Sequence, residues 1–329
     1  MLGYLKLKTN DEELYESDYL NYIKDNKWGK IQYYICNIYF KFVVLIKNFF
    51  NIITVKQIYN GFLFILPFEN INQKKIERGI YKLQILMKKY NIQTIVVSEE
   101  LKQYYNLKKN MELIDRKVSI IEGKGLIPYL IKEIFDYILQ KSQKIMEEQD
   151  LYICVKEDKT IYIDNILYLS KYFKTINIVT SNINCFQKLA ERYEQKENII
   201  ITVTNNKKKS LKKARYIINF DFDDKQIKKY NIYRNAIILT INETETYSAI
   251  GFDGVEIKQI GVNTSDEIKE YFKKYNLLGN CSQAALYESL INKKQDLSRI
   301  KKQMKEDNIT VIKLYGNNGE INNNEFSDL

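Results

Sequence analysis

A chain of 329 residues with 45% apolar side chains is long enough to fill the cores of one large or two ordinary globular domains. Its formal charge is +10, but 45 of its 51 basic residues are lysines spread along the whole sequence, so nucleic acid is not an expected partner. Histidine is absent, which excludes histidine-based acid–base catalysis, histidine-activated nucleophiles and imidazole metal ligands.

The cysteines and the first residues indicate a cytoplasmic protein. Cys36, Cys154, Cys185 and Cys281 lie far apart without CxxC spacing, and are expected to be buried thiols in a reducing compartment. The chain turns acidic at residues 11–13, before an apolar signal region develops, so secretion is not expected. The abundance of Lys, Asn, Ile and Tyr indicates an AT-rich coding sequence of the bacterial type.

Residues 1–148 are predicted to form an N-terminal α/β domain. Its apolar runs are typical of strands, and its amphipathic stretches are typical of helices. The strands are predicted at 2–8, 61–68, 94–97 and 117–121, and the helices at 11–24, 30–55, 73–89 and 126–146.

The predicted helix at residues 30–55 is unusually apolar. Its interruptions Lys30, Asn37, Lys41 and Asn48 fall within about 40° of one another on a helix, which leaves one narrow polar stripe. Lys41 and Lys47 lie inside any spanning window, so a transmembrane helix is not expected. A buried core helix is the favoured interpretation, and a membrane-surface or partner-docking helix at 31–55 is the alternative.

A possible phosphate cradle lies at Gly123, Lys124 and Gly125, between a predicted strand and a predicted helix. Backbone N–H groups at a helix start attract anions, and Lys124 would add positive charge. The three residues lack the third glycine of a dinucleotide turn and the GK[ST] of a P-loop, so a plain turn is the favoured interpretation.

Residues 149–315 alternate between short apolar runs and helical patterns. Nearly continuous apolar runs are expected for parallel strands that are buried on both faces. The sequence therefore predicts a doubly wound, mostly parallel α/β sheet. Its strands are predicted at 151–155, 176–180, 199–204, 216–220 and 236–241, and its helices at 161–173, 183–194, 208–214 and 225–230.

This part of the chain resembles the NAD(P)-binding Rossmann domain in the style of shikimate dehydrogenase and glutamyl-tRNA reductase. Residues 151–155 resemble the first strand, 176–182 the second strand and its turn, and 214–219 the fourth strand. The resemblance covers about 90 residues and is one of pattern, without the glycine fingerprint. It implies NAD(P) as a cofactor, with Lys156, Glu157, Thr180, Ser181 and Asn182 at the cofactor site.

Several of these positions depart from the dinucleotide pattern. No glycine occurs between Gly125 and Gly251, and residues 156–159 are Lys-Glu-Asp-Lys where the family has its glycine turn. Their side chains would block backbone approach to a pyrophosphate, and the two carboxylates would repel it. Alternatively, residues 151–163 form a hairpin, which would remove the first crossover helix.

Asp221, Asp223 and Asp224 follow the strand at 216–220 and are weak candidates for a Mg²⁺ site. Helix capping and solvation are the favoured interpretation, and no metal is expected. Beyond residue 243 we expect a hairpin at 247–262, helices at 265–275, 282–291 and 296–306, and a strand at 309–315. The Asn-rich residues 316–329 are expected to form a flexible tail.

Taken together, the sequence favours a non-catalytic cytoplasmic Rossmann-like protein, a binding or regulatory module for a protein or small ligand, with no cofactor. One alternative is an NAD(P)-dependent oxidoreductase with an atypical phosphate turn, in which Lys or Asp would act as acid or base. The other is peripheral membrane association through residues 31–55.

Overall fold

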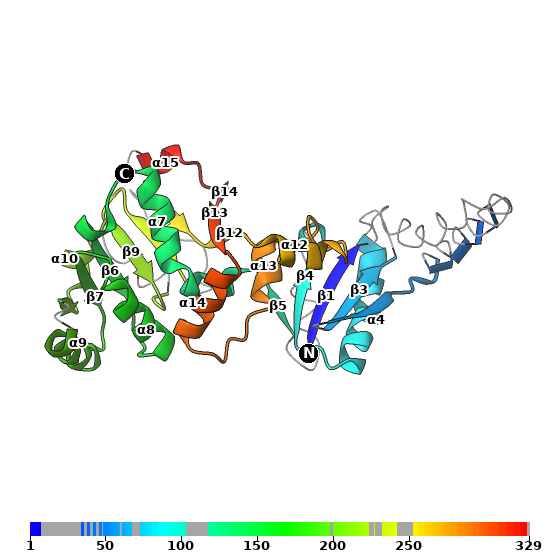
Figure 1. The fold of residues 1–329 in the computed structure, drawn as a ribbon, viewed down its shortest axis with the longest axis horizontal. Helices are drawn as coiled ribbons and strands as arrows, with labels where there is room; N and C mark the ends of the chain where they lie inside the picture. Colours follow the sequence, from blue (N-terminus) through cyan, green and yellow to red (C-terminus); the bar gives the residue numbers. More distant parts are fainter. Residues whose placement is uncertain are drawn as a thin grey trace. The chain divides into compact units, whose positions relative to one another are not determined.

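Figure 1 shows the computed structural model of the chain, which folds into two compact units. The first comprises residues 1–122 and 266–290, and the second residues 123–265 and 291–329. The structure describes residues 1–7, 34–35, 38–39, 42–43, 46–47, 49–59, 61–67, 73–102, 118–197, 200–223, 227, 232–241 and 253–327.

The first unit is built on a five-stranded sheet in the order β2-β3-β1-β4-β5. Strands β1, β3, β4 and β5 are parallel, and β2 pairs antiparallel with β3 at the edge. The strands are β1 (Leu2–Leu7), β2 (Thr54–Ile58), β3 (Gly61–Leu66), β4 (Thr94–Val97) and β5 (Ser119–Ile121). The continuous apolar runs of β3 and β4 fit burial on both faces, as expected for parallel strands. Strand β1 is buried as well, although it contains Lys6.

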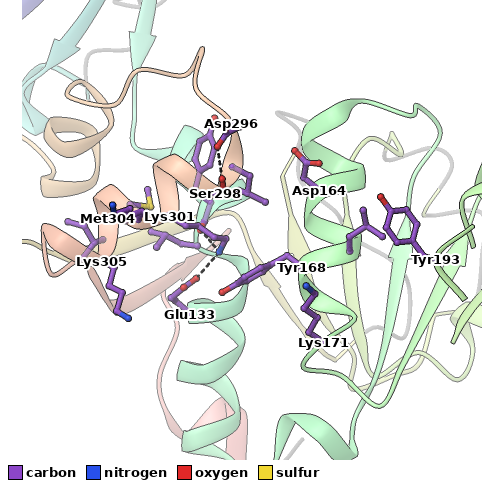
Figure 2. A pocket seen from close by; sticks show the side chains of 16 residues that line it. Glu133, Asp164, Tyr168, Lys171, Tyr193, Asp296, Ser298, Lys301, Met304 and Lys305 are labelled. Carbon is purple, nitrogen blue, oxygen red and sulfur yellow. Dashed lines mark hydrogen bonds and ion pairs between the residues drawn. The ribbon is translucent and has the colours of Figure 1, made fainter. Parts of the chain in front are cut away.

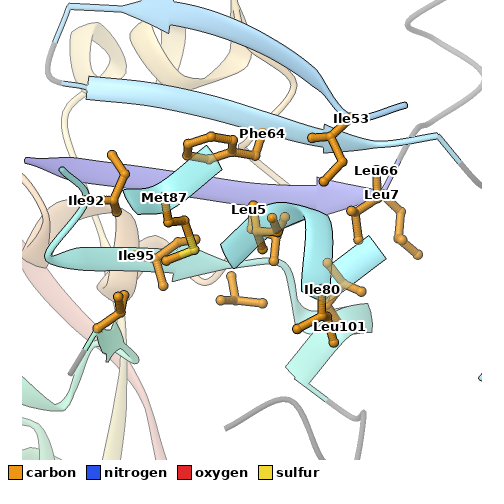
Figure 3. Close-up of a cluster of buried hydrophobic side chains, with 13 residues drawn as sticks. Leu5, Leu7, Ile53, Phe64, Leu66, Ile80, Met87, Ile92, Ile95 and Leu101 are labelled. Carbon is orange, nitrogen blue, oxygen red and sulfur yellow. The ribbon is translucent and has the colours of Figure 1, made fainter. Parts of the chain in front are cut away.

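Helices cover both faces of this sheet. On one face, α4 (Gln73–Lys89) and the short α5 (Glu99–Lys102) pack over a cluster that includes Leu5, Phe64 and Met87 (Figure 3). On the other face, α12 (Asp266–Lys273) and α13 (Gln283–Glu288) pack over a second cluster. A hydrogen bond of 2.9 Å joins the hydroxyls of Tyr4 and Ser289. These contacts explain why residues 266–290 return to the first unit.

The second unit contains a six-stranded, wholly parallel sheet in the order β11-β10-β9-β6-β7-β8. Numbered within this sheet, the order is 3-2-1-4-5-6, which is the order of Rossmann folds. The strands are β6 (Asp150–Cys154), β7 (Thr175–Val179), β8 (Ile201–Thr204), β9 (Tyr216–Asn219), β10 (Ile237–Thr240) and β11 (Val255–Ile257). The predicted α/β class with a mostly parallel, Rossmann-like sheet is therefore confirmed.

The remaining elements of the second unit surround this sheet. A small antiparallel sheet contains β12 (Gln259–Asn263), β13 (Thr310–Gly316) and β14 (Gly319–Glu320). The helices are α7 (Ile131–Lys141), α8 (Thr160–Leu169), α9 (Ile183–Glu197), α10 (Lys207–Leu211), α14 (Leu297–Glu306) and α15 (Asn324–Ser327). Two 3₁₀ helices, η1 (Lys124–Tyr129) and η2 (Met146–Glu148), flank α7.

The observed division of the chain differs from the predicted boundary near residue 148. Residues 123–148 belong to the second unit, where η1 contacts α8 and α7 contacts β13. The predicted helix at 126–146 is divided: Pro128 lies within η1, and the α-helix begins only at Ile131. A proline inside a helix removes a backbone donor, so it suits this short 3₁₀ segment better than a helix interior.

Two further predictions differ at the C-terminal end. In place of a hairpin at 247–262, β11 pairs with β10 and β12 pairs with β13, so the two strands belong to different sheets; residues 242–252 lie outside the described part. The expected flexible tail carries β14 and α15, and the side chain of Phe326 is fully buried. Burial of one large aromatic side chain supplies about 3 kcal/mol, which explains why these residues are ordered.

The alternative of a hairpin at 151–163 is wrong, because β6 is followed by helix α8. The predicted helix at 11–24 and, apart from Ile227, the one at 225–230 lie outside the described residues. Of the predicted helix at 30–55, the described residues from Tyr34 to Phe50 are helical, and β2 begins at Thr54. Within the described residues, no helix is both long and apolar enough to cross a bilayer.

Candidate functional site

The topological switch point of the six-stranded sheet lies between β6 and β9. These neighbouring parallel strands begin the two halves of the sheet, which extend in opposite directions from this point, and ligands of doubly wound folds bind in the crevice at the carboxyl ends of such strands. The loops that follow them are residues 155–159 and 220–223. The first loop is where the resemblance to NAD(P)-binding domains places a pyrophosphate.

In this chain the first loop is hydrogen-bonded to a carboxylate of the protein itself. The Oδ1 atom of Asp221 accepts the backbone N–H of Lys156 at 2.7 Å, and its Oδ2 atom accepts that of Glu157 at 2.9 Å. Asp221 is only 9% exposed, so the accepting carboxylate of these charge-assisted hydrogen bonds is largely shielded from water, whereas Glu157 is exposed. The backbone donors that a glycine turn would offer to a phosphate are therefore bonded to Asp221.

The backbone of the turn after β9 is also hydrogen-bonded within the protein. The Asn219 side chain accepts the Phe222 N–H and donates to the Phe222 carbonyl, both at 3.0 Å. Phe222 is fully buried, and the ammonium groups of Lys207 and Lys156 lie 4.7 and 6.0 Å from its ring centroid. This turn holds Asp221 in place against the loop after β6.

The other expected cofactor residues are divided between two places. At the end of β7, the Thr180 hydroxyl accepts the N–H of Asn182 at 3.0 Å, while Ser181 is exposed. Gly123, in the left-handed region with φ of 91°, precedes η1, so Gly123, Lys124 and Gly125 open the second unit rather than its switch point.

The aspartates after β9 have separate environments. Asp223 is exposed and its carboxylate pairs with the Lys156 ammonium at 3.4 Å, while Asp224 lies outside the described residues. In the part of the chain that the structure describes, no group of three or more Cys, Asp or Glu side chains is placed to hold a metal ion.

Cys154 lies at the end of β6, next to this site. Its buried thiol makes the free energy of unfolding sensitive to pH in the alkaline range. Burial raises the pKa of its thiol from 9.0 to about 12; Lys207 lowers it and Asp221 raises it further, to smaller extents. The unfolded chain then loses the proton first, so the free energy of unfolding should fall as the pH rises from about 9 to about 12.

Urea unfolding at a series of pH values tests this dependence. In Cys154→Ala the loss of stability between about pH 9 and pH 11 should be smaller than in the wild type, because the protected thiol is gone. Cys185→Ala is the comparison variant: burial and a hydrogen bond to Asp158 also raise the pKa of that half-exposed thiol, but less than that of Cys154, so its effect should be smaller. If the free energy of unfolding fell with pH equally in the wild type and in Cys154→Ala, the buried thiol of Cys154 would not be the cause of the pH dependence.

A cleft of about 820 Å³ lies elsewhere in the second unit, lined by residues of η1, α7, α8, α9 and α14 (Figure 2). Leu167, Tyr168, Leu297, Met304 and Ile309 give it an apolar surface. Charged side chains also line it, from both the α8 and the α14 side. A concave, mostly apolar surface with a few polar groups is typical of a small-molecule site.

Lys301 of α14 is the most buried cation in the cleft, with a side chain 13% exposed. Its ammonium donates to the Tyr129 carbonyl at 2.9 Å, lies 3.6 Å from Oε2 of Glu133, and sits 4.1 Å from the Tyr168 ring centroid. Burial lowers the pKa of Lys301, and Glu133 partly offsets this. Its positive charge is thus already compensated by the protein.

Asp164 of α8, unlike Lys301, has a charge that no neighbouring group of opposite sign compensates among the described residues. Burial raises the pKa of its carboxyl, and the negative charge of Asp296 raises it further. Within the described residues, no cationic side chain pairs with Asp164. Asp296 caps α14 by accepting the N–H of Arg299 at 2.8 Å and the hydroxyl of Ser298 at 2.7 Å. The cleft therefore presents one carboxylate without an ion-pair partner in the described part of the chain, beside a second that pairs with Arg299 at 3.5 Å. Lys171, Lys302 and Lys305 also line the cleft.

Sequence reasoning did not identify this cleft. Its walls come from residues 129–133, 164–171 and 296–309, which are far apart in the chain and individually ordinary. The one local signal was the Asp296–Ser298 start of a predicted helix, which indicates a cap and not a site.

No protein-family model and no curated protein matches the chain. Among solved structures it is similar to ligand-free aspartate transcarbamoylase from Trypanosoma cruzi, with 10% identity over 64% of this chain and 70% of that one, and a TM-score of 0.27. The same enzyme with carbamoyl aspartate and phosphate has 9% identity, coverage of 88% and 82%, and a TM-score of 0.30. L-tryptophan dehydrogenase from Nostoc punctiforme has 10% identity, coverage of 94% and 84%, and a TM-score of 0.29.

Proposed function

We propose that this chain is a non-catalytic binding module that takes a small organic cation into the cleft between α8 and α14. The observation that carries the proposal is the pairing of an apolar, aromatic-lined cleft of about 820 Å³ with the uncompensated carboxylate of Asp164. A cation beside Asp164 and Asp296 would relieve the repulsion between the two carboxylates. The apolar part of the ligand would cover Leu167 and Leu297.

The loop after β6 at the switch point argues against the alternative function, an NAD(P)-dependent oxidoreductase. An NAD(P)-dependent oxidoreductase would need the backbone donors of the loop after β6 for a pyrophosphate, and Asp221 already accepts two of them. A dinucleotide bound there in the usual way would have to displace a buried carboxylate and meet its negative charge.

Binding of benzylamine, compared with benzoate, tests the proposal on the full chain. The two probes have similar aromatic bodies and opposite charges, so chemical-shift titration separates a cation site from a merely apolar one. We expect saturable millimolar binding of benzylamine at amides of α8 and α14, about tenfold weaker in Asp164→Asn. Asp158→Asn, which removes an exposed carboxylate outside the cleft, should bind benzylamine like the wild type.

The other possible results of this titration each contradict one part of the proposal. Tighter binding of benzoate than of benzylamine would contradict the claim that the ligand is a cation. Absence of binding by both probes, in a protein whose spectrum shows it folded, would overturn the cleft as the ligand site. Stabilisation of the wild type by NAD or NADP in a thermal-shift assay would favour the oxidoreductase.

A further inference from the structure

The first unit carries an unusual concentration of exposed apolar side chains between residues 34 and 50. Eight of the seventeen exposed large hydrophobic residues in the described part of the chain lie there, with exposed fractions from 36% for Ile46 to 84% for Phe49. These eight residues form what we call the apolar face: Tyr34, Ile35, Ile38, Tyr39, Phe42, Ile46, Phe49 and Phe50.

The eight side chains of the apolar face share one side at helical spacing. All eight residues are helical, and at 100° per residue their side chains fall within an arc of about 160°. No polar side chain of the described residues interrupts that arc, and Lys47 lies beyond its edge, half-buried. Contiguous exposed apolar patches on this scale mark interaction sites. The sequence-based preference for a core helix is therefore not supported at these eight positions.

The carboxyl end of this helix is attached to the folded part of the first unit. The Lys82 ammonium on α4 donates to the carbonyl of Phe50, and also to that of Asn51 at 3.2 Å. The N–H of Ile52 bonds to the carbonyl of Lys47 at 2.9 Å, and β2 starts two residues later at Thr54. A lysine at the last carbonyls of a helix satisfies acceptors that lack a helical partner.

We propose that the apolar face binds the surface of an anionic lipid bilayer, with its side chains inserted at the level of the headgroups. Five of its eight side chains are aromatic, and aromatic rings are favoured at the membrane–water interface. The chain carries a net charge of +10, and Lys30, Lys41, Lys47 and Lys56 lie in or beside the segment. Positive charge attracts anionic headgroups, whereas it opposes association with a second copy of the same chain.

Sedimentation of the full chain with lipid vesicles tests this proposal. Vesicles of phosphatidylcholine mixed with phosphatidylserine should carry the protein into the pellet, and pure phosphatidylcholine vesicles should carry much less of it. The double variant Phe42→Ser, Phe49→Ser removes two rings from the apolar face at unchanged charge, and we expect its partition coefficient to fall at least about tenfold.

The matched control is Ile145→Ser, Ile312→Ser, which removes two exposed apolar side chains of the second unit and should bind vesicles like the wild type. A wild-type protein that stays in the supernatant with both kinds of vesicle would overturn the proposal. So would a Phe42, Phe49 variant that binds as well as the wild type. Self-association that this variant abolishes, without lipid binding, would instead make the face an interface between copies.

Discussion

Replacement of Asp221 by alanine is expected to lower the free energy of unfolding by about 2 kcal/mol. The substitution leaves the N–H groups of Lys156 and Glu157 without the acceptor that they have in the folded protein. A donor that loses its partner costs about 1 to 3 kcal/mol when it is buried. The two donors here are part-buried, so each contributes toward the lower end of that range. Equilibrium unfolding in urea measures the change directly.

The same variant should acquire an affinity for small anions. Removal of the carboxylate leaves two converging donors at the carboxyl edge of a parallel sheet, which is a common arrangement for anion sites. Added inorganic phosphate should therefore raise the melting temperature of Asp221→Ala more than that of the wild type. This rescue distinguishes an occupied anion site from a residue that is merely important for folding.

Asp223→Ala is the control for both measurements. Its carboxylate is exposed and its ion pair with Lys156 is long, so we expect a change in stability below about 1 kcal/mol and no gain in phosphate response. An Asp221→Ala protein as stable as the wild type, or one that phosphate does not stabilise further than the wild type, would contradict the role assigned to Asp221.

The strands of the second unit were the most predictable part of the fold. Strands buried on both faces need continuous apolar runs, and such runs at 151–155, 176–180 and 216–220 match β6, β7 and β9 to within a residue or so at each end. The helices that follow β6 and β7 were also recognisable from their periodicity.

The assignment of segments to units was not predictable from such patterns. Residues 266–290 pack on the first sheet although they follow the second sheet in the chain, and residues 123–148 belong to the second unit. An amphipathic pattern shows that a helix must cover something, but not which sheet it covers. The boundary therefore depends on tertiary contacts such as the one between Tyr4 and Ser289.

The chemistry of the candidate sites was only partly visible in the sequence. The missing glycines showed that the loop after β6 was unsuited to a pyrophosphate, and Asp221 was noticed, but as a weak metal candidate. Its actual partners lie 65 and 64 residues away, and the contact follows from the adjacency of β6 and β9 in the sheet. A strand order of the Rossmann type, taken together with an aspartate directly after the fourth strand, was the signal that could have identified it.

Gly61→Ala is expected to destabilise the first unit by about 3 kcal/mol or more. Gly61 opens β3 opposite Leu2 of β1, and a Cβ atom at this position would lie 2.1 Å from the Leu2 carbonyl oxygen and 2.9 Å from its carbon. These are backbone atoms of a paired strand, so relief requires β1 and β3 to separate. Gly3→Ala is the matched control, because its Cβ would meet side-chain atoms of Ile92, Phe64 and Ile95, at 3.1, 3.3 and 3.5 Å. Side chains can shift without separating the strands, so its destabilisation should be smaller.

Amide hydrogen exchange shows which strands the Gly61→Ala substitution destabilises. In Gly61→Ala the amides of β1, β3 and β4 should lose protection, because β1 lies between β3 and β4 in the same sheet. The amides of β6, β7 and β9 belong to a separate sheet with its own core, and they should keep theirs. Equal loss of protection in both sheets would mean that the two units unfold as one cooperative body. Unchanged protection in β1 and β3 would mean that the strand pair tolerates the added methyl group.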